Sequence, residues 1–129
     1  MPDKEGIISG EWKSANSTIE LTIPLIVFQQ DNTYIAYCPA LDLSGYGNTE
    51  NEAYESFNVV MGEYFLYTTR KKTLADDLRK RGWIVRNNKT KPMRPPELSK
   101  LLETNKDFNR IFNNFPFKKI DQLVSVPSC

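Results

Sequence analysis

The chain has 129 residues, of which 40% are hydrophobic and 26% charged, a balance typical of a globular protein with one core rather than of a disordered or collagen-like chain. It contains no histidine, so the commonest general base and the commonest metal ligand are both absent. No apolar run reaches the roughly 20 residues that a membrane span needs, and no signal-peptide pattern stands at the start, so we expect a cytoplasmic protein without a membrane partner.

The net charge of +1 conceals two oppositely charged halves. Residues 1–67 contain two basic and ten acidic side chains, a net charge of −8, whereas residues 68–129 contain fifteen basic and six acidic ones, a net charge of +9. This asymmetry predicts two surfaces that bind different partners, or contact between the acidic surface of one copy and the basic surface of another. The alternative is solvated charge that segregates along the chain without any partner.

The first half predicts a three-stranded antiparallel meander. From Ser17 to Gln30, apolar side chains recur at every second position, which is the period of a half-buried strand. Pro24 cannot donate a ladder hydrogen bond, so this strand is expected to lie at a sheet edge or to bend there. The turn residues QDNT at 30–33 and the segment TYIAYC then predict a hairpin, followed by a short third strand at about 42–46.

A long helix is predicted to follow the meander. Thr49 and Glu52 have the spacing of a capping box, in which the hydroxyl and the carboxylate each accept a hydrogen bond from an otherwise unpaired backbone amide. The apolar residues that follow have helical spacing: Ala53, Phe57, Val60, Met61, Tyr64 and Phe65. We expect this stripe to pack on the sheet.

The remainder of the chain predicts short elements. Residues 73–82 are expected to form a helix with Thr73 as N-cap and Gly82 at its end, and residues 83–85 a short strand. We divide the chain into an α+β domain at 1–86, a basic, proline-containing linker at 87–96 and a mainly helical extension at 97–129. The extension predicts two short helices with a break near Thr104 or Asn105, and then a possible closing strand, KIDQLVSVP.

The glycines before the long helix do not predict a catalytic or phosphate-binding loop. The first helical turn carries Glu50 and Glu52 instead of a basic residue, and Ser44 has no histidine to activate it. The carboxylates have no metal-loop spacing, and Cys38 and Cys129 are expected to be reduced thiols. We therefore expect no enzymatic activity, metal or cofactor, with a metal-dependent nuclease as a distant alternative.

A structural function is expected for the same stretch. Pro39 ends a strand, Gly45 and Gly47 permit positive φ or close backbone approach, and Thr49 starts the helix that carries Ala53.

The order YCPAL, GYGNT and ENEAYESF resembles the HicB-like antitoxins of bacterial toxin–antitoxin modules over about residues 19–85. Asn48 stands where that family usually has Asp. The residues that match the family pattern are Tyr37, Cys38, Pro39, Leu41, Gly47, Thr49, Glu52 and Ala53.

The resemblance implies a fold and a partner. The fold is a partial RNase H-like α+β domain, in which a three-stranded meander carries one packed helix and a further short strand. The partner is a small basic HicA-like toxin that cleaves mRNA, and the acidic half of this chain suits it by electrostatic complementarity. The expected toxin-binding residues are Asp42, Tyr46, Glu50, Glu52 and Glu55. The alternative is a stand-alone HicB-like domain that binds a ligand or another protein, because a fold does not dictate a function.

Many HicB-like proteins also repress their own operon through a C-terminal DNA-binding domain. Here the order of helix, helix and strand after the linker departs from a ribbon-helix-helix. The basic residues expected to contact operator phosphates are Arg86, Lys89, Lys91 and Arg94, with solvated linker charge as the alternative. The LVSVP segment is expected to pack against a second copy, which favours a homodimer.

Overall fold

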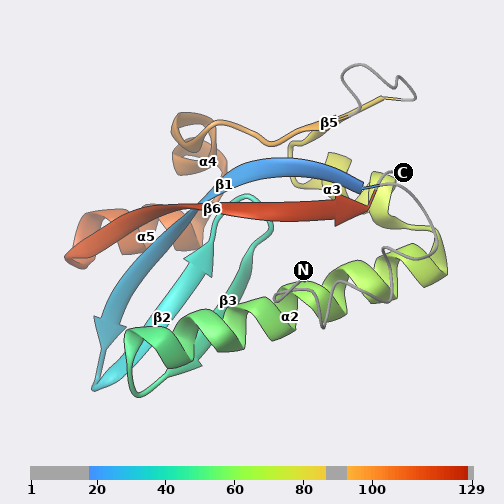
Figure 1. Cartoon of the computed structure of the whole chain (residues 1–129). Helices are drawn as coiled ribbons and strands as arrows, with labels where there is room; N and C mark the ends of the chain where they lie inside the picture. Colours follow the sequence, from blue (N-terminus) through green and yellow to red (C-terminus); the bar gives the residue numbers. More distant parts are fainter. Residues whose placement is uncertain (1–17, 87–92, 128–129) are drawn as a thin grey trace.

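Four antiparallel strands form the main sheet, in the order β3-β2-β1-β6 (Figure 1). The computed structural model describes residues 18–86 and 93–127. The predicted α+β class is confirmed, but the sheet has four strands instead of three, because the end of the C-terminal extension joins it. The strands are β1 (Thr18–Gln30), β2 (Thr33–Cys38), β3 (Leu43–Gly47) and β6 (Phe117–Pro127).

The β1–β2 turn follows from its two central residues. Gln30 pairs with Thr33, and Asp31 and Asn32 between them have φ angles of 53° and 67°. Two consecutive positive φ angles are typical of the type I′ turn that suits a two-residue hairpin, and Asp and Asn tolerate them better than most residues. The predicted hairpin is confirmed.

Strand β6 pairs with β1 along its whole length, from Thr18 opposite Pro127 to Phe28 opposite Phe117. The LVSVP segment was expected to pack against a second copy, whereas here it pairs with β1 of its own chain. The pairing of β1 with β2 ends at Ile26, so Pro24 has a strand neighbour on the β6 side only. Its missing amide is therefore tolerated inside a 13-residue strand.

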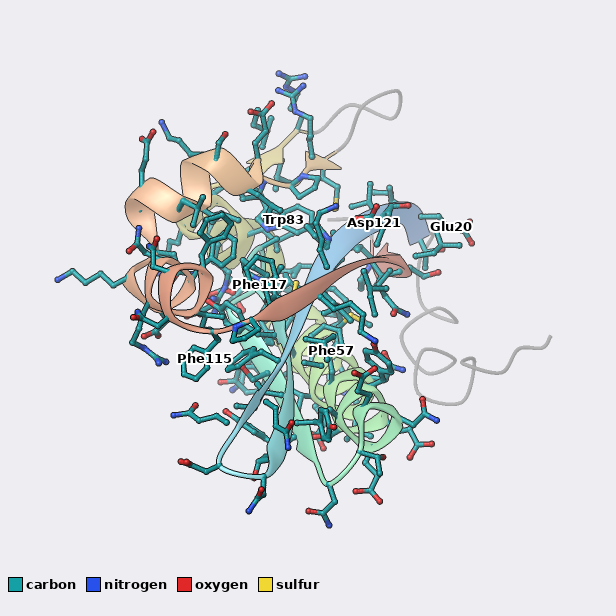
Figure 2. All side chains as sticks on the ribbon, turned by 90° about the vertical axis from the view of Figure 1, so that its left-hand side faces the viewer. Glu20, Phe57, Trp83, Phe115, Phe117 and Asp121 are labelled. Atoms are coloured by element: carbon teal, nitrogen blue, oxygen red, sulfur yellow. The ribbon has the colours of Figure 1, made fainter. Side chains whose placement is uncertain are left out.

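Helix α2 (Glu50–Lys71) covers one face of the sheet (Figure 1). Thr49 Oγ1 accepts a hydrogen bond from the Glu52 amide at 3.1 Å, and Glu52 Oε1 accepts one from the Asn48 amide at 2.8 Å. The predicted cap is confirmed, although the carboxylate bonds the amide that precedes Thr49. Figure 2 shows Phe57 between this helix and the sheet, where it is fully buried. Within the described ranges, no helix combines the length and the apolarity needed to cross a membrane.

The glycines of β3 allow α2 to approach the sheet closely. A Cβ atom on Gly45 would lie 2.1 Å from the Phe57 amide nitrogen and 2.5 Å from the Ala53 carbonyl oxygen. A Cβ on Gly47 would lie 2.4 Å from Glu52 Cβ. Close approach, and not positive φ, is therefore the reason for these two glycines.

Short elements follow α2. They are α3 (Leu74–Lys80), β4 (Ile84–Val85), β5 (Met93–Arg94), α4 (Leu98–Thr104) and α5 (Lys106–Asn114). Strand β4 pairs with β5 in a separate two-stranded sheet. Gly82, with a φ of 96°, follows the end of α3 as predicted, and Asn105 separates α4 from α5. Thr73 occupies the N-cap position of α3 as predicted, although its side chain makes no capping hydrogen bond.

A charged network joins α2 to α3. The Tyr64 hydroxyl donates a hydrogen bond to the Asp77 carboxylate, and Arg81 Nε donates another at 2.9 Å. Partial burial alone would raise the pKa of Asp77, but the hydrogen bonds from Tyr64 and Arg81 outweigh it and lower that pKa below its ordinary value. The network therefore favours the ionised carboxylate in the folded protein.

Helices α4 and α5 cover the sheet face opposite α2, as the two views together show (Figures 1 and 2). Four consecutive residues of β1, from Leu25 to Phe28, are buried, which requires cover on both faces. The rings of Phe28 and Phe115 lie 5.0 Å apart. Leu101 and Phe108 belong to the same hydrophobic cluster as the sheet and α2, so the segment predicted as an extension shares the main core.

Candidate functional site

The five predicted toxin-binding residues do not form one surface. They lie in three places: Asp42 at the start of β3, Glu50 on the β6 side of α2, and Tyr46, Glu52 and Glu55 where β3 meets α2. Three of their carboxylates make hydrogen bonds within the chain.

Asp42 belongs to a hydrogen-bonded chain at the β2–β3 turn. It accepts a hydrogen bond of 2.6 Å from the Tyr37 hydroxyl, which in turn accepts one of 2.8 Å from Asn105 Nδ2. Burial and then the bond to Asp42 raise the pKa of Tyr37 above its ordinary value, so the phenol stays protonated and donates. Asp42 therefore anchors the turn to the α4–α5 junction.

Glu50 connects α2 to β6. Its Oε1 lies 2.7 Å from Lys118 Nζ, and both side chains are partly exposed. The hydrogen bond to Glu50 raises the pKa of Lys118. This exposed ion pair joins the acidic half of the chain to the basic half, and it leaves Glu50 a weaker candidate for partner binding.

The β3–α2 patch consists of Tyr46, Glu52, Glu55 and Val59. The Tyr46 amide donates to Ser56 Oγ at 3.1 Å, which places the edge of β3 beside the helical turn that carries Glu55. Val59 follows Glu55 one turn later. Tyr46 is 58% exposed and Val59 45%, and Glu55 makes no hydrogen bond or ion pair within the described part of the chain. The sequence did not single out Val59, although it lies off the buried stripe of α2.

The sequence analysis did not identify Trp83, which contacts the predicted structural motif next to Pro39. Its indole Nε1 donates a buried hydrogen bond of 2.8 Å to the Ala40 carbonyl, directly after Pro39. The Trp83 side chain is only 3% exposed. It fixes the β2–β3 turn to the segment after α3. A lone tryptophan 43 residues away gives no sequence signal for this contact.

Cysteine thiols and clusters of metal-ligating side chains are the next candidates for catalytic groups. Burial raises the pKa of the Cys38 thiol to about 12, so it is a poor nucleophile at neutral pH. Cys129 lies outside the described residues. Among residues 18–86 and 93–127, no three His, Cys, Asp or Glu side chains are grouped so that they could hold a metal ion.

The predicted phosphate-contacting residues are only partly described. Arg86 and Arg94 are exposed at the β4–β5 hairpin, where Arg94 pairs with Ile84. Lys89 and Lys91 lie outside the described residues. Operator binding by this segment stays a prediction.

A second concentration of cations, which the sequence did not single out, lies elsewhere. It surrounds a groove of about 710 Å³ between the β2–β3 turn, the end of α3 and the α4–α5 junction. The cations that line this basic groove are Arg79, Lys80, Arg81, Lys100 and Lys106.

Comparisons of the chain with protein-family models, with curated proteins and with solved structures find no match. The resemblance to the HicB-like antitoxins therefore depends on the motif residues alone.

Proposed function

We propose that this protein is a HicB-like antitoxin that binds and neutralises a small basic toxin of the HicA-like, mRNA-cleaving type. The junction of β3 with α2 carries the proposal, because the motif glycines, the Thr49 cap and Ala53 together form the sheet-to-helix contact that the resemblance implies. A partial RNase H-like fold is part of this proposal. The proposal includes homodimerisation and autoregulation through operator DNA.

The β3–α2 patch is the surface we assign to the toxin. Glu52 and Glu55 supply negative charge in the first turns of α2, and the exposed side chains of Tyr46 and Val59 supply apolar contact area. Aromatic anchors surrounded by polar groups are typical of interface centres, and opposite charge accelerates association and disfavours wrong partners. A basic toxin matches both properties.

Purification from the native host at low salt, followed by mass spectrometry, tests the proposal directly. We expect a small basic polypeptide in stoichiometric amount, and we expect co-expression of this protein to restore growth to cells that express that polypeptide. Recovery of the protein alone, with no small basic partner, would refute the antitoxin function and favour a stand-alone binding domain.

The charge of the patch is tested by Glu55→Lys, with Glu103→Lys on α4 as the matched control. Both are exposed helical glutamates without a hydrogen-bond partner among the described residues. We expect Glu55→Lys to weaken toxin binding about tenfold at low salt and less at high salt, because screening reduces exposed electrostatic interactions. Equal binding by the two variants would exclude the β3–α2 patch. Glu50→Lys is a poorer test, because it also breaks the ion pair with Lys118.

A further inference from the structure

The basic groove combines three segments that are distant in the sequence. Pro39 and Asp42 come from the β2–β3 turn, residues 79–82 from the end of α3, and residues 96–107 from the segment containing α4 and the start of α5. Five cations and two carboxylates, those of Asp42 and Asp107, line it. The groove therefore has an excess of positive charge on several sides.

Two of the cations are held in place by the protein. Arg79 donates to the Val85 carbonyl at 3.0 Å and lies 3.5 Å from an Asp76 carboxylate oxygen. Arg81 pairs with Asp77 at 2.9 Å. Guanidinium groups have further donors in fixed geometry, so these arginines retain hydrogen-bonding capacity toward a ligand.

The three lysines of the groove have no ion-pair partner among the described residues. Lys80, Lys100 and Lys106 are exposed, and none makes a hydrogen bond or ion pair within residues 18–86 and 93–127. They come from three helices, α3, α4 and α5, and line the same hollow. Ammonium groups around one hollow can bind a phosphate group as point charges.

The walls of the groove are braced before any ligand binds. The hydrogen bonds from Asn105 to Tyr37 and from Tyr37 to Asp42 connect the α4–α5 junction to the β2–β3 turn. The Trp83 indole ties the same turn to the segment after α3. A preorganised site reduces the ordering cost of binding, which increases affinity.

We propose that the basic groove binds a phosphorylated ligand of nucleotide size. Its volume lies within the range of roughly 300 to 1,000 Å³ typical of small-molecule sites. The lysines and arginines suit a phosphate group, and Asp42 and Asp107 offer acceptors for hydroxyl or amino groups. The volume of the groove suits a compact ligand, and a short duplex in the test below distinguishes it from a nucleic-acid backbone. This site is independent of the proposed toxin surface.

Calorimetric titration of the full chain with ADP, AMP and pyrophosphate tests the proposal, with a short DNA duplex as comparison. We expect ADP to bind with a Kd below roughly 1 mM. The double variant Lys80→Gln with Lys100→Gln should bind at least about tenfold more weakly, because it loses two charge-assisted contacts. Lys71→Gln with Lys72→Gln, at the end of α2 and outside the groove, makes the same charge change and should bind like the unaltered protein.

Three results would overturn the proposal. They are no binding of any phosphorylated small probe, equal weakening by the groove and control variants, and groove-dependent binding of the duplex without binding of ADP. Far-UV circular dichroism verifies that each variant is folded. If the double variant does not fold, the single variant Lys106→Gln replaces it. The proposal then requires that Lys106→Gln bind ADP more weakly than the control variant does.

Discussion

Gly45→Ala is the most severe test of how α2 packs on the sheet. The added Cβ would meet the Phe57 amide nitrogen at 2.1 Å and the Ala53 carbonyl oxygen at 2.5 Å, whereas ordinary contacts begin at 3.4 Å. Both atoms belong to the helix backbone, so no rotamer change relieves the clash, and α2 must move by about 1 Å against a close-packed core. Overpacking of this kind costs about 3 kcal/mol, a large part of a typical folding free energy of 5–15 kcal/mol.

Urea unfolding followed by far-UV circular dichroism measures this cost as the difference in unfolding free energy. Gly82→Ala is an informative comparison, because Gly82 has a φ of 96° but its nearest neighbour would lie 3.5 Å from the new Cβ. That variant should lose only about 1 kcal/mol, from conformational strain. If Gly45→Ala loses no more stability than Gly82→Ala, the close approach of β3 and α2 is wrong.

Three further predictions concern buried and charged groups. Trp83→Phe leaves the Ala40 carbonyl without its buried donor and should lower the unfolding free energy by about 2 kcal/mol; a loss below about 0.5 kcal/mol would show that this hydrogen bond does not hold the turn. Asp77→Asn should cost about 1 kcal/mol at pH 7. Because the folded pKa of Asp77 lies below its unfolded value near 3.8, that stabilisation is present above the unfolded pKa and is lost as the pH falls through the folded pKa, so the unfolding free energies of the two proteins should converge as the pH is lowered below 3.8. In a Cys129→Ser variant, Cys38 should resist a thiol reagent at pH 8 until urea is added, whereas rapid labelling of the native protein would contradict its burial.

Local features of the fold were predictable because their causes lie within a few residues. The Asp31-Asn32 turn, the Thr49 cap and the break at Asn105 each depend on side chains that bond or tolerate the adjacent backbone. The long helix was predictable because its apolar stripe, from Ala53 to Phe65, spans more than three turns. Such signals need no knowledge of the tertiary fold.

The partner of β1 was not predictable from the same signals. Phe28 and Phe117 pair across 89 residues of chain, and no local pattern selects an intramolecular neighbour over a second copy. The burial of β1 on both faces also depends on distant segments, because the Phe28 ring packs against Phe115 directly after α5, and Ile26 lies on the same face of the strand as Phe28. Without that neighbour, the C-terminal segment looked like a separate helical extension.

The candidate sites were likewise predictable only in part. The predicted toxin-binding set contained Tyr46 and Glu55, which lie together on an exposed surface, but it also contained Asp42 and Glu50, which the fold places elsewhere. The basic groove was missed because its lysines belong to three different helices and follow no motif.

The position of Asp42 decides how the two proposed surfaces relate. Asp42 lines the basic groove at one end of β3, and Tyr46 belongs to the β3–α2 patch near the other end, four residues or about 13 Å along the strand. A groove ligand and a toxin would therefore not compete directly for the same side chains. Because β3 is held to α2 through Gly45, the strand connecting the two surfaces is rigidly supported, and neither site depends on a lysine or glutamate of the other. We expect ADP to leave toxin affinity within about twofold of its value without ADP, whereas competition would require the toxin to extend from the patch along β3 into the groove.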